Sequence, residues 1–251
     1  MTAGIVSNEH KDPGLAYSRK IREFLEAEGV TLAPLGQTAD FWIVLGGDGT
    51  MLKAAQQAAL LDVPLLGINL GTMGFLTDVD KQDGLKALEN VLAGRYQLQK
   101  RLMLTTHGRL ALNEAFLGST GRLSYFSVYV NDMHMDDIRA DGIIVATPTG
   151  STAYNLSAGG PILAPYGEMM VITPICPHSL STRPWVISAD DKVRIVVRDS
   201  LPSPCLVLDG EEFMTIPPGE SVEISRAPVS ATIIKTTDTH FYEILRKKKI
   251  L

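Results

Sequence analysis

Hydrophobic and polar positions follow two different patterns along the chain, and the change comes near Tyr96. Before that residue, three short apolar runs predict buried strands, at 3–8, 41–45 and 63–69. Helix-forming segments alternate with these runs, and the first of them carries one apolar face, made up of Tyr17, Ile21, Phe24 and Leu25. Strands that alternate with helices at this spacing predict a parallel sheet with right-handed crossovers.

After Tyr96 the chain consists of short β-rich runs broken by Gly, Pro, Asn and Asp, with little helical periodicity. This pattern of short runs and turn residues favours an antiparallel sandwich or a related β architecture. We therefore expect an α/β domain over 1–97 and a β-rich domain over 98–236, with an active site in the cleft between them. The final segment, 237–251, has apolar anchors and is expected to pack back on the first domain as a helix or a strand.

Composition narrows the class of protein. Of the 251 residues, 45% are hydrophobic and 20% are charged, which argues against disorder. The net charge of −5 gives no general attraction for nucleic acid or for an acidic membrane. The two cysteines, Cys176 and Cys205, have no paired spacing, so neither a disulfide framework nor a zinc knuckle is predicted. Because we find no signal peptide and no window near the roughly 20 apolar residues of a membrane span, we expect a cytoplasmic protein.

The turn "GGDGT" at 46–50 follows the second apolar run and opens a helical segment. Glycines in that position let backbone N–H groups approach phosphate oxygens, with help from the helix N-terminus. The dinucleotide fingerprint is not matched, because Leu52 stands where its third glycine would be, and the P-loop pattern is absent. A tight turn with Asp48 or Thr50 as a helix N-cap stays an open alternative.

Asp48 is the unexpected residue in that turn. A carboxylate repels phosphate unless a cation stands between them, or unless it receives a proton from a hydroxyl. Both arrangements belong to phosphoryl transfer, in which one side chain orients a nucleophilic hydroxyl and Mg²⁺ neutralises the phosphates. Asp48 is therefore a candidate base.

Two further stretches carry polar groups in apolar surroundings. The first, at 140–163, places Ser151, Thr152 and Ser157 beside Tyr154, so that hydroxyl donors for a phosphate, ribose or base lie next to a ring that can stack. A Gly/Ser/Thr-rich connection is the alternative there. The second is Asn113–Glu114, which is either a turn or a polar pair whose partners would be ribose hydroxyls or an adenine edge.

With these stretches in order, the chain resembles the NAD kinase family over nearly its whole length. The matching segments are "GGDGT" at 46–50, "NLGTMGFLTDVD" at 69–80, "LNEAFL" at 112–117, "DGIIVATPTGSTAYNLSAGGPIL" at 141–163 and "TPICPHSLSTRPWVI" at 173–187. The segment around "TPTGSTAY" is specific to the family. "GGDGT" alone is shared with diacylglycerol- and sphingosine-type lipid kinases.

The resemblance implies ATP-dependent phosphorylation of the adenosine-side ribose 2′-hydroxyl of NAD, giving NADP. It implies a divalent metal, Mg²⁺, for which the sequence names no protein ligands, and a homodimer or homotetramer without nucleic-acid or membrane partners. Asp48 matches the proton acceptor, and the turn residues that would hold phosphate are Gly46, Gly47, Gly49 and Thr50. The β-rich domain would bind NAD.

Positions that match dinucleotide contacts of the family, or that continue the same run of residues, are Asn113, Glu114, Asp141, Thr152, Ala153, Tyr154, Asn155, Leu156 and Ser157. Lys53 and Arg139 match more variable contact positions. Glu211 stands where the family often has glutamine. Because a carboxylate only accepts hydrogen bonds, a contact that needs the amide donor would be lost or changed there.

Two other functions are compatible with parts of the sequence. A lipid kinase would share "GGDGT", but it predicts an exposed apolar or basic membrane-facing element and leaves "TPTGSTAY" unexplained. A non-catalytic NAD(P) sensor would use the same loops without needing Asp48. The sequence leaves open whether the donor is ATP alone or also polyphosphate, whether NADH is accepted, how the enzyme is regulated and which oligomer forms.

Overall fold

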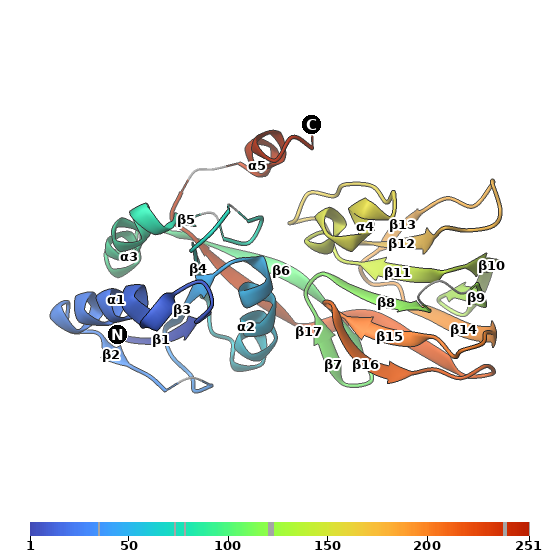
Figure 1. Ribbon diagram of the computed structural model, residues 1–251, viewed down its shortest axis with the longest axis horizontal. Helices are drawn as coiled ribbons and strands as arrows, with labels where there is room; N and C mark the ends of the chain where they lie inside the picture. Colours follow the sequence, from blue (N-terminus) through green and yellow to red (C-terminus); the bar gives the residue numbers. More distant parts are fainter. Residues whose placement is uncertain (35, 73, 78, 120–122, 238–239, 251) are drawn as a thin grey trace. The chain divides into compact units, whose positions relative to one another are not determined.

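The computed structural model describes residues 1–34, 36–72, 74–77, 79–119, 123–237 and 240–250, which form two compact units. Unit 1 comprises Met1–Arg101 and Val229–Leu251, and unit 2 comprises Leu102–Pro228 (Figure 1). The sequence places the corresponding boundaries at 97 and 236. The difference arises because two strands, β6 (Gln97–Thr106) and β17 (Ser221–Lys235), run through both boundaries and leave no linker for composition to mark.

Unit 1 is built on a parallel sheet, as the alternating pattern predicts. Its strand order is β17-β4-β3-β1-β2, and the short β5 also pairs with β4. Each neighbouring pair is parallel. The bounds are β1 Thr2–Ser7, β2 Thr31–Leu32, β3 Phe41–Gly46, β4 Leu65–Asn69 and β5 Val79–Asp80.

The helices of unit 1 are η1 Pro13–Leu15, α1 Ala16–Ala27, α2 Asp48–Leu61, η2 Lys81–Asp83, α3 Gly84–Leu92 and α5 Phe241–Lys247. Apolar residues of α1 and α3 share one core with residues of the sheet. α1 buries Tyr17, Ile21 and Leu25, which confirms its predicted face. The last segment is a helix, α5, in which Ile244 and Leu245 are buried. Among the described residues, no helix has the length and apolar character needed to cross a membrane.

The connections of unit 1 reverse direction between β1 and β3, and this place in the sheet is its topological switch point. From β1 the chain passes through α1 to β2 on one side, whereas from β3 it passes through α2 to β4 on the other. In open α/β sheets, ligands bind outside the carboxyl ends of the strands at such a point. The residues that directly follow β1 and β3 therefore occupy the expected ligand position of this unit.

Unit 2 is an antiparallel β sandwich, which confirms the predicted architecture. One sheet has the order β13-β12-β11-β8-β15-β16, and in the other β10-β9-β14 is followed by β17. The core contains residues of both sheets, including Leu117 and Ile143 from the first and Phe126 and Ile195 from the second. The remaining bounds are β7 Arg109–Ala111, β8 Glu114–Gly118, β9 Ser124–Val130, β10 Met133–Ala140, β11 Gly142–Ala146, η3 Gly150–Thr152, α4 Tyr154–Ser157, β12 Met169–Ile175, β13 Trp185–Ser188, β14 Val193–Asp199, β15 Cys205–Leu208 and β16 Glu211–Thr215.

Candidate active site

The glycine turn joins β3 to α2 at the switch point. β3 is buried along its whole length, and Gly47 adopts an extended conformation as the N-cap of α2. A Cβ on Gly46 would lie 2.3 Å from Oγ1 of Thr50, so this close approach requires glycine. The first N–H groups of an α-helix have no partner within the helix, so the start of α2 presents donors suited to an anion.

The carboxylate of Asp48 does not cap its own helix. Its Oδ2 accepts a hydrogen bond from the backbone N–H of Phe75 at 2.8 Å, and its Oδ1 accepts one from Leu76 at 2.9 Å. Thr77 Oγ1 adds a longer contact to Oδ1, at 3.4 Å. The alternative of a capping Asp48 or Thr50 is therefore wrong, since the cap is Gly47 without a side-chain bond.

The loop after β4 is shaped around this carboxylate. A Cβ on Gly74 would lie 2.0 Å from Asp48 Oδ1 and 2.6 Å from Thr77 Oγ1, so only glycine lets the loop approach. This contact could not be predicted from the sequence, because the donors are backbone groups of Phe75 and Leu76. Met73 and Asp78 of the same loop lie outside the described residues.

In unit 2 the Asn113–Glu114 turn is held by a residue that sequence reasoning missed. The carboxylate of Asp209 accepts backbone hydrogen bonds from Leu112 at 2.8 Å, Asn113 at 2.7 Å and Glu114 at 3.2 Å. Asp209 has a φ of 49° and joins β15 to β16 with Gly210, so the "DG" dipeptide marks a two-residue hairpin turn. That turn signal was present in the sequence, but the hydrogen bonds to a segment nearly a hundred residues away were not readable from it.

The structure brings the Asn113–Glu114 turn together with the loop that follows β11. The N–H of Thr147 donates to the carbonyl of Asn113 at 2.8 Å, and its hydroxyl donates to the carbonyl of Leu112 at 2.6 Å. A Cβ on Gly150 would lie 2.0 Å from the Asn113 carbonyl oxygen. These two predicted stretches therefore form one polar site in unit 2.

Two buried oxygens at this polar site have no hydrogen-bond partner in the described part of the chain. They are Oε2 of Glu114, whose residue is 7% exposed, and Oγ1 of Thr149, whose residue is 6% exposed. Burial, and next the charge of Asp209, raises the pKa of the Glu114 carboxyl to about 8. Because buried polar atoms are nearly always hydrogen-bonded, this pair fits a ligand that brings its own polar groups.

Glu114→Gln should change how stability depends on pH in the ligand-free protein. The Glu114 carboxyl has a pKa near 4.5 when unfolded and about 8 when folded, so between these values the folded state binds more protons. Raising the pH then destabilises the wild type, by up to about 1.4 kcal/mol per pH unit, and this contribution is absent in Glu114→Gln. Urea unfolding of both proteins at pH 5, 6.5 and 8 measures the difference. Parallel pH profiles would contradict the assignment.

The segment 152–157 contains both exposed and fully buried residues. Tyr154 is 44% exposed and its ring lies 5.6 Å from that of Phe116, so one face remains available for stacking. Asn155 is fully buried and donates to the carbonyls of Ser151 and Pro161, while it accepts from Thr173. Asn155 therefore fixes the loop. Thr152, Ala153 and Leu156 are half-buried, and Ser157 is exposed.

Ser151 does not act as predicted. Its hydroxyl is fully buried and donates to the carbonyl of Pro148 at 2.7 Å, so it braces the loop instead of offering a donor to a ligand.

Other predicted residues lie apart from these clusters. Gly142, next to Asp141, pairs with Gly118 at one end of β11, whereas Ala146 pairs with Glu114 at the other. Asp141 is thus separated from Glu114 by about 16 Å of strand. Arg139 belongs to β10, and its guanidinium lies over the ring of Tyr125 at 5.3 Å. Lys53 is exposed on α2 and Glu211 is exposed at the start of β16.

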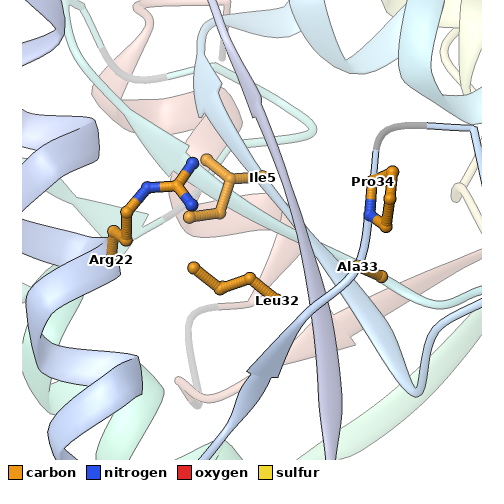
Figure 2. A pocket seen from close by; sticks show the side chains of 5 residues that line it. All are labelled: Ile5, Arg22, Leu32, Ala33 and Pro34. Carbon is orange, nitrogen blue, oxygen red and sulfur yellow. The ribbon is translucent and has the colours of Figure 1, made fainter.

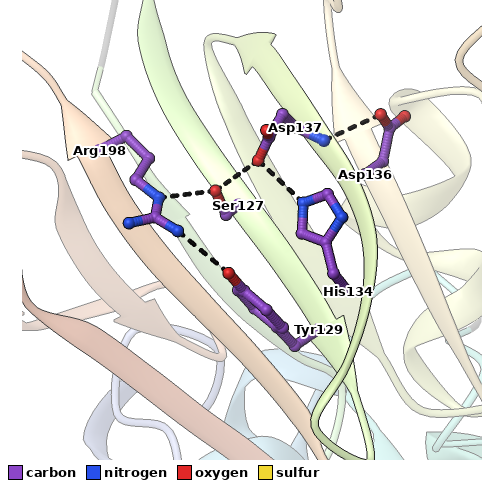
Figure 3. A network of polar contacts seen from close by, with 6 residues as sticks. All are labelled: Ser127, Tyr129, His134, Asp136, Asp137 and Arg198. Atoms are coloured by element: carbon purple, nitrogen blue, oxygen red, sulfur yellow. Dashed lines mark hydrogen bonds and ion pairs between the residues drawn. The ribbon is translucent and has the colours of Figure 1, made fainter.

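Other polar and hollow features contain none of the predicted site residues. A pocket beside β1 and β2 is lined by Ile5, Arg22, Leu32, Ala33 and Pro34 (Figure 2). On β9, β10 and β14, Ser127 donates to Asp137 and accepts from Arg198 (Figure 3). Within the described part of the chain, no three His, Cys, Asp or Glu side chains gather so as to hold a metal ion.

Comparison with known proteins identifies the family. Residues 7–96 match the model of the ATP-NAD kinase N-terminal domain, and residues 112–236 match that of the C-terminal domain. An NAD kinase of Carboxydothermus hydrogenoformans is 43% identical over 83% of this chain and 79% of its own length. An NAD kinase of Ruminiclostridium cellulolyticum is 38% identical over 98% of this chain and 96% of its own.

A solved structure agrees with these relatives. The crystal structure of an NAD kinase from Archaeoglobus fulgidus in complex with ATP is 26% identical, has a TM-score of 0.84 and covers 100% of both chains. The N-terminal family model thus includes the glycine turn, and the C-terminal family model includes the polar site of unit 2. The chain belongs to the NAD kinase family.

Proposed function

We propose that this NAD kinase transfers the terminal phosphoryl group of ATP to the 2′-hydroxyl of the adenosine ribose of NAD, with Asp48 as the proton acceptor. The observation that carries the proposal is the fixed carboxylate of Asp48 at the start of α2, held by two backbone N–H groups. A carboxylate oxygen has two lone pairs. Oδ2 accepts from Phe75 alone among the described residues, so it retains a lone pair for the substrate hydroxyl.

The reaction follows from that geometry. A bond forms between the 2′-oxygen and the terminal phosphorus while the bond to the departing ADP breaks. An alcohol is too weak an acid to be deprotonated in advance by a carboxylate, but the loose transition state of phosphoryl transfer needs only alignment and late proton capture. Asp48 supplies both, and the backbone N–H groups of the Gly46–Thr50 turn hold the phosphate oxygens.

The residues around the turn fit a divalent ion that arrives with the nucleotide. Mg²⁺ keeps several waters and is bound largely through substrate phosphates instead of a protein cage. Asp48 is the carboxylate at the turn, and both of its oxygens already accept backbone hydrogen bonds. When bound, the ion neutralises charge on the phosphate oxygens.

The dinucleotide is assigned to unit 2. At the polar site of unit 2, Glu114 Oε2 and Thr149 Oγ1 are buried and have no hydrogen-bond partner among the described residues, and hydroxyl or amide groups of NAD would satisfy them. Tyr154 presents a ring face for stacking. Asn113 belongs to the turn that Asp209 holds through its backbone N–H, and we assign it to the same dinucleotide site.

The direct test is product formation. Purified protein is incubated with NAD, ATP and Mg²⁺, and NADP is measured with an NADP-specific dehydrogenase. We expect NADP to appear in proportion to enzyme and to ATP consumed. NAD binding without any NADP would instead favour the non-catalytic sensor, and phosphorylation of a diacylglycerol or sphingosine without NADP would favour the lipid kinase. Replacing ATP with inorganic polyphosphate, and NAD with NADH, defines the donor and acceptor range.

We also infer a homodimer or homotetramer located in the cytoplasm. Light scattering of the purified protein measures its mass in solution, for which we expect two or four times the chain mass of 27.2 kDa. A mass of 27.2 kDa at working concentration would contradict this inference.

A further inference from the structure

Lys11 lies at the switch point of unit 1, in the turn that follows β1. A Cβ on Gly47 would lie 2.6 Å from the Lys11 ammonium nitrogen, and one on Gly71 would lie 3.7 Å from it. Gly47 follows β3 and Gly71 follows β4. The ammonium group therefore lies against both glycine positions at the carboxyl end of the sheet. This closeness could not be predicted from the sequence, because Lys11 is far from the glycine turn along the chain.

The turn that carries Lys11 is firmly held. Next to it, Asp12 is 2% exposed, and its carboxylate accepts hydrogen bonds from the backbone N–H groups of Tyr17 at 2.8 Å and Ser18 at 2.9 Å. On the other side, the backbone N–H of Asn8 donates to Leu45 at 3.0 Å. The backbone on both sides of Lys11 is thus anchored to α1 and to the end of β3.

Asn8 also ties this turn to the glycine turn itself. Its Nδ2 donates to Oγ1 of Thr50 at 3.3 Å. Thr50 lies in the first turn of α2, close to the N–H groups that are expected to meet phosphate. Lys11 is consequently placed by two independent connections beside the phosphate-binding backbone.

Lys11 is exposed, and the charges around its ammonium group favour a bound anion. The N-terminus of α2 carries a partial positive charge from the aligned peptide dipoles, which repels an ammonium group. Among the described residues, no carboxylate forms an ion pair with Lys11, and the nearby Asp48 directs its oxygens to the loop at 74–77. A phosphate on the turn would be attracted both by the helix N-terminus and by Lys11.

We propose that Lys11 binds a phosphate group of the nucleotide donor and holds it on the Gly46–Gly47 backbone. The proposal rests on the proposed function of the same turn and adds a residue to its donor side. A lysine ammonium acts on phosphate as a point charge at the end of a flexible side chain. An arginine at the same position, which is also charged and of similar length, should therefore replace part of its effect. Lys11 therefore contributes to binding and positioning of the donor, and leaves binding of NAD to other residues.

The experiment compares Lys11→Met and Lys11→Arg with the wild type, and uses Lys20→Met as the matched control. Lys20 is an exposed lysine of α1, so its variant makes the same charge change elsewhere in unit 1. We expect Lys11→Met to lower kcat/KM for ATP by roughly ten- to a hundredfold, as for loss of a hydrogen bond to a charged group. The KM for NAD should stay within about twofold, Lys11→Arg should recover most of the loss, and Lys20→Met should behave as the wild type.

A second measurement separates this proposal from the proposed function. Isothermal titration of ATP with Mg²⁺, without NAD, should show weaker binding to Lys11→Met than to the wild type. If the wild type formed no NADP, the proposed function would fail while this titration still tested Lys11. Equal ATP affinity for the wild type and Lys11→Met, or an equal loss in Lys20→Met, would overturn the role of Lys11.

Discussion

Asp48→Asn should lower kcat by about a hundredfold or more while the protein stays folded and binds NAD. General acid–base contributions are typically about 10²- to 10⁴-fold, and the amide has the shape of the carboxylate without its ability to accept a proton. The change also places an NH₂ group opposite one of the backbone N–H donors of Phe75 and Leu76. We therefore expect a loss of stability of about 1–3 kcal/mol alongside the kinetic effect.

Asp62→Asn is the matched control for that variant. Asp62 is the exposed C-cap of the same helix, with a φ of 52° that asparagine adopts readily, so the same chemical change is made outside the site. Its kcat should equal that of the wild type. Thermal unfolding and NAD titration of both variants separate the loss of turnover from loss of fold or of substrate. A similar fall in kcat in both variants would remove the special role of Asp48.

Gly150→Ala should destabilise unit 2 by about 3 kcal/mol and weaken NAD binding by about tenfold or more. The new Cβ would lie 2.0 Å from the carbonyl oxygen of Asn113 and 2.4 Å from its carbonyl carbon, and these are backbone atoms that cannot rotate away. The loop that carries Gly150 would have to move away from the Asn113–Glu114 turn. This movement would separate Thr149 from Glu114, whose oxygens are proposed to bind NAD. Urea unfolding and isothermal titration with NAD measure the two effects.

Gly167→Ala provides the comparison for this glycine. The nearest atoms to its new Cβ would be the Ala164 carbonyl oxygen at 3.2 Å and the end of Met169 at 3.4 Å, so a small adjustment accommodates it. We expect a loss below about 1 kcal/mol and unchanged NAD affinity. Equal losses in the two variants would show that the close contact at Gly150 is not what limits this loop.

The architecture of both units could be predicted from the sequence, because alternating strand and helix patterns before Tyr96 give way to short β-rich runs after it. The run at 41–45 is wholly apolar and becomes β3, which is buried on both faces, as expected for a central parallel strand. The face of α1 was readable from Tyr17, Ile21 and Leu25. In unit 2, frequent turn residues between short runs marked an antiparallel arrangement.

The candidate site was only partly predictable, because its key contacts are long-range or use the backbone. The residue types at Asp48 and Glu114 indicated chemistry, but their partners did not follow from spacing. Phe75 and Leu76 act through N–H groups, which every residue except proline has. Only the fold brings Asp209 to the Asn113–Glu114 turn of unit 2 and Lys11 to the glycine turn of unit 1. In the same way, β11 separates Asp141 from Glu114, although both stand in motifs of the family.

The most direct test of Asp48 as the proton acceptor is the single-turnover rate of NADP formation. Wild type and Asp48→Asn, each in excess over NAD and saturated with ATP and Mg²⁺, are mixed and quenched, so that binding and product release do not limit the rate. If Asp48 accepts the 2′-hydroxyl proton, the rate in Asp48→Asn falls by about a hundredfold or more at unchanged NAD affinity. Equal single-turnover rates in the two proteins would contradict the account.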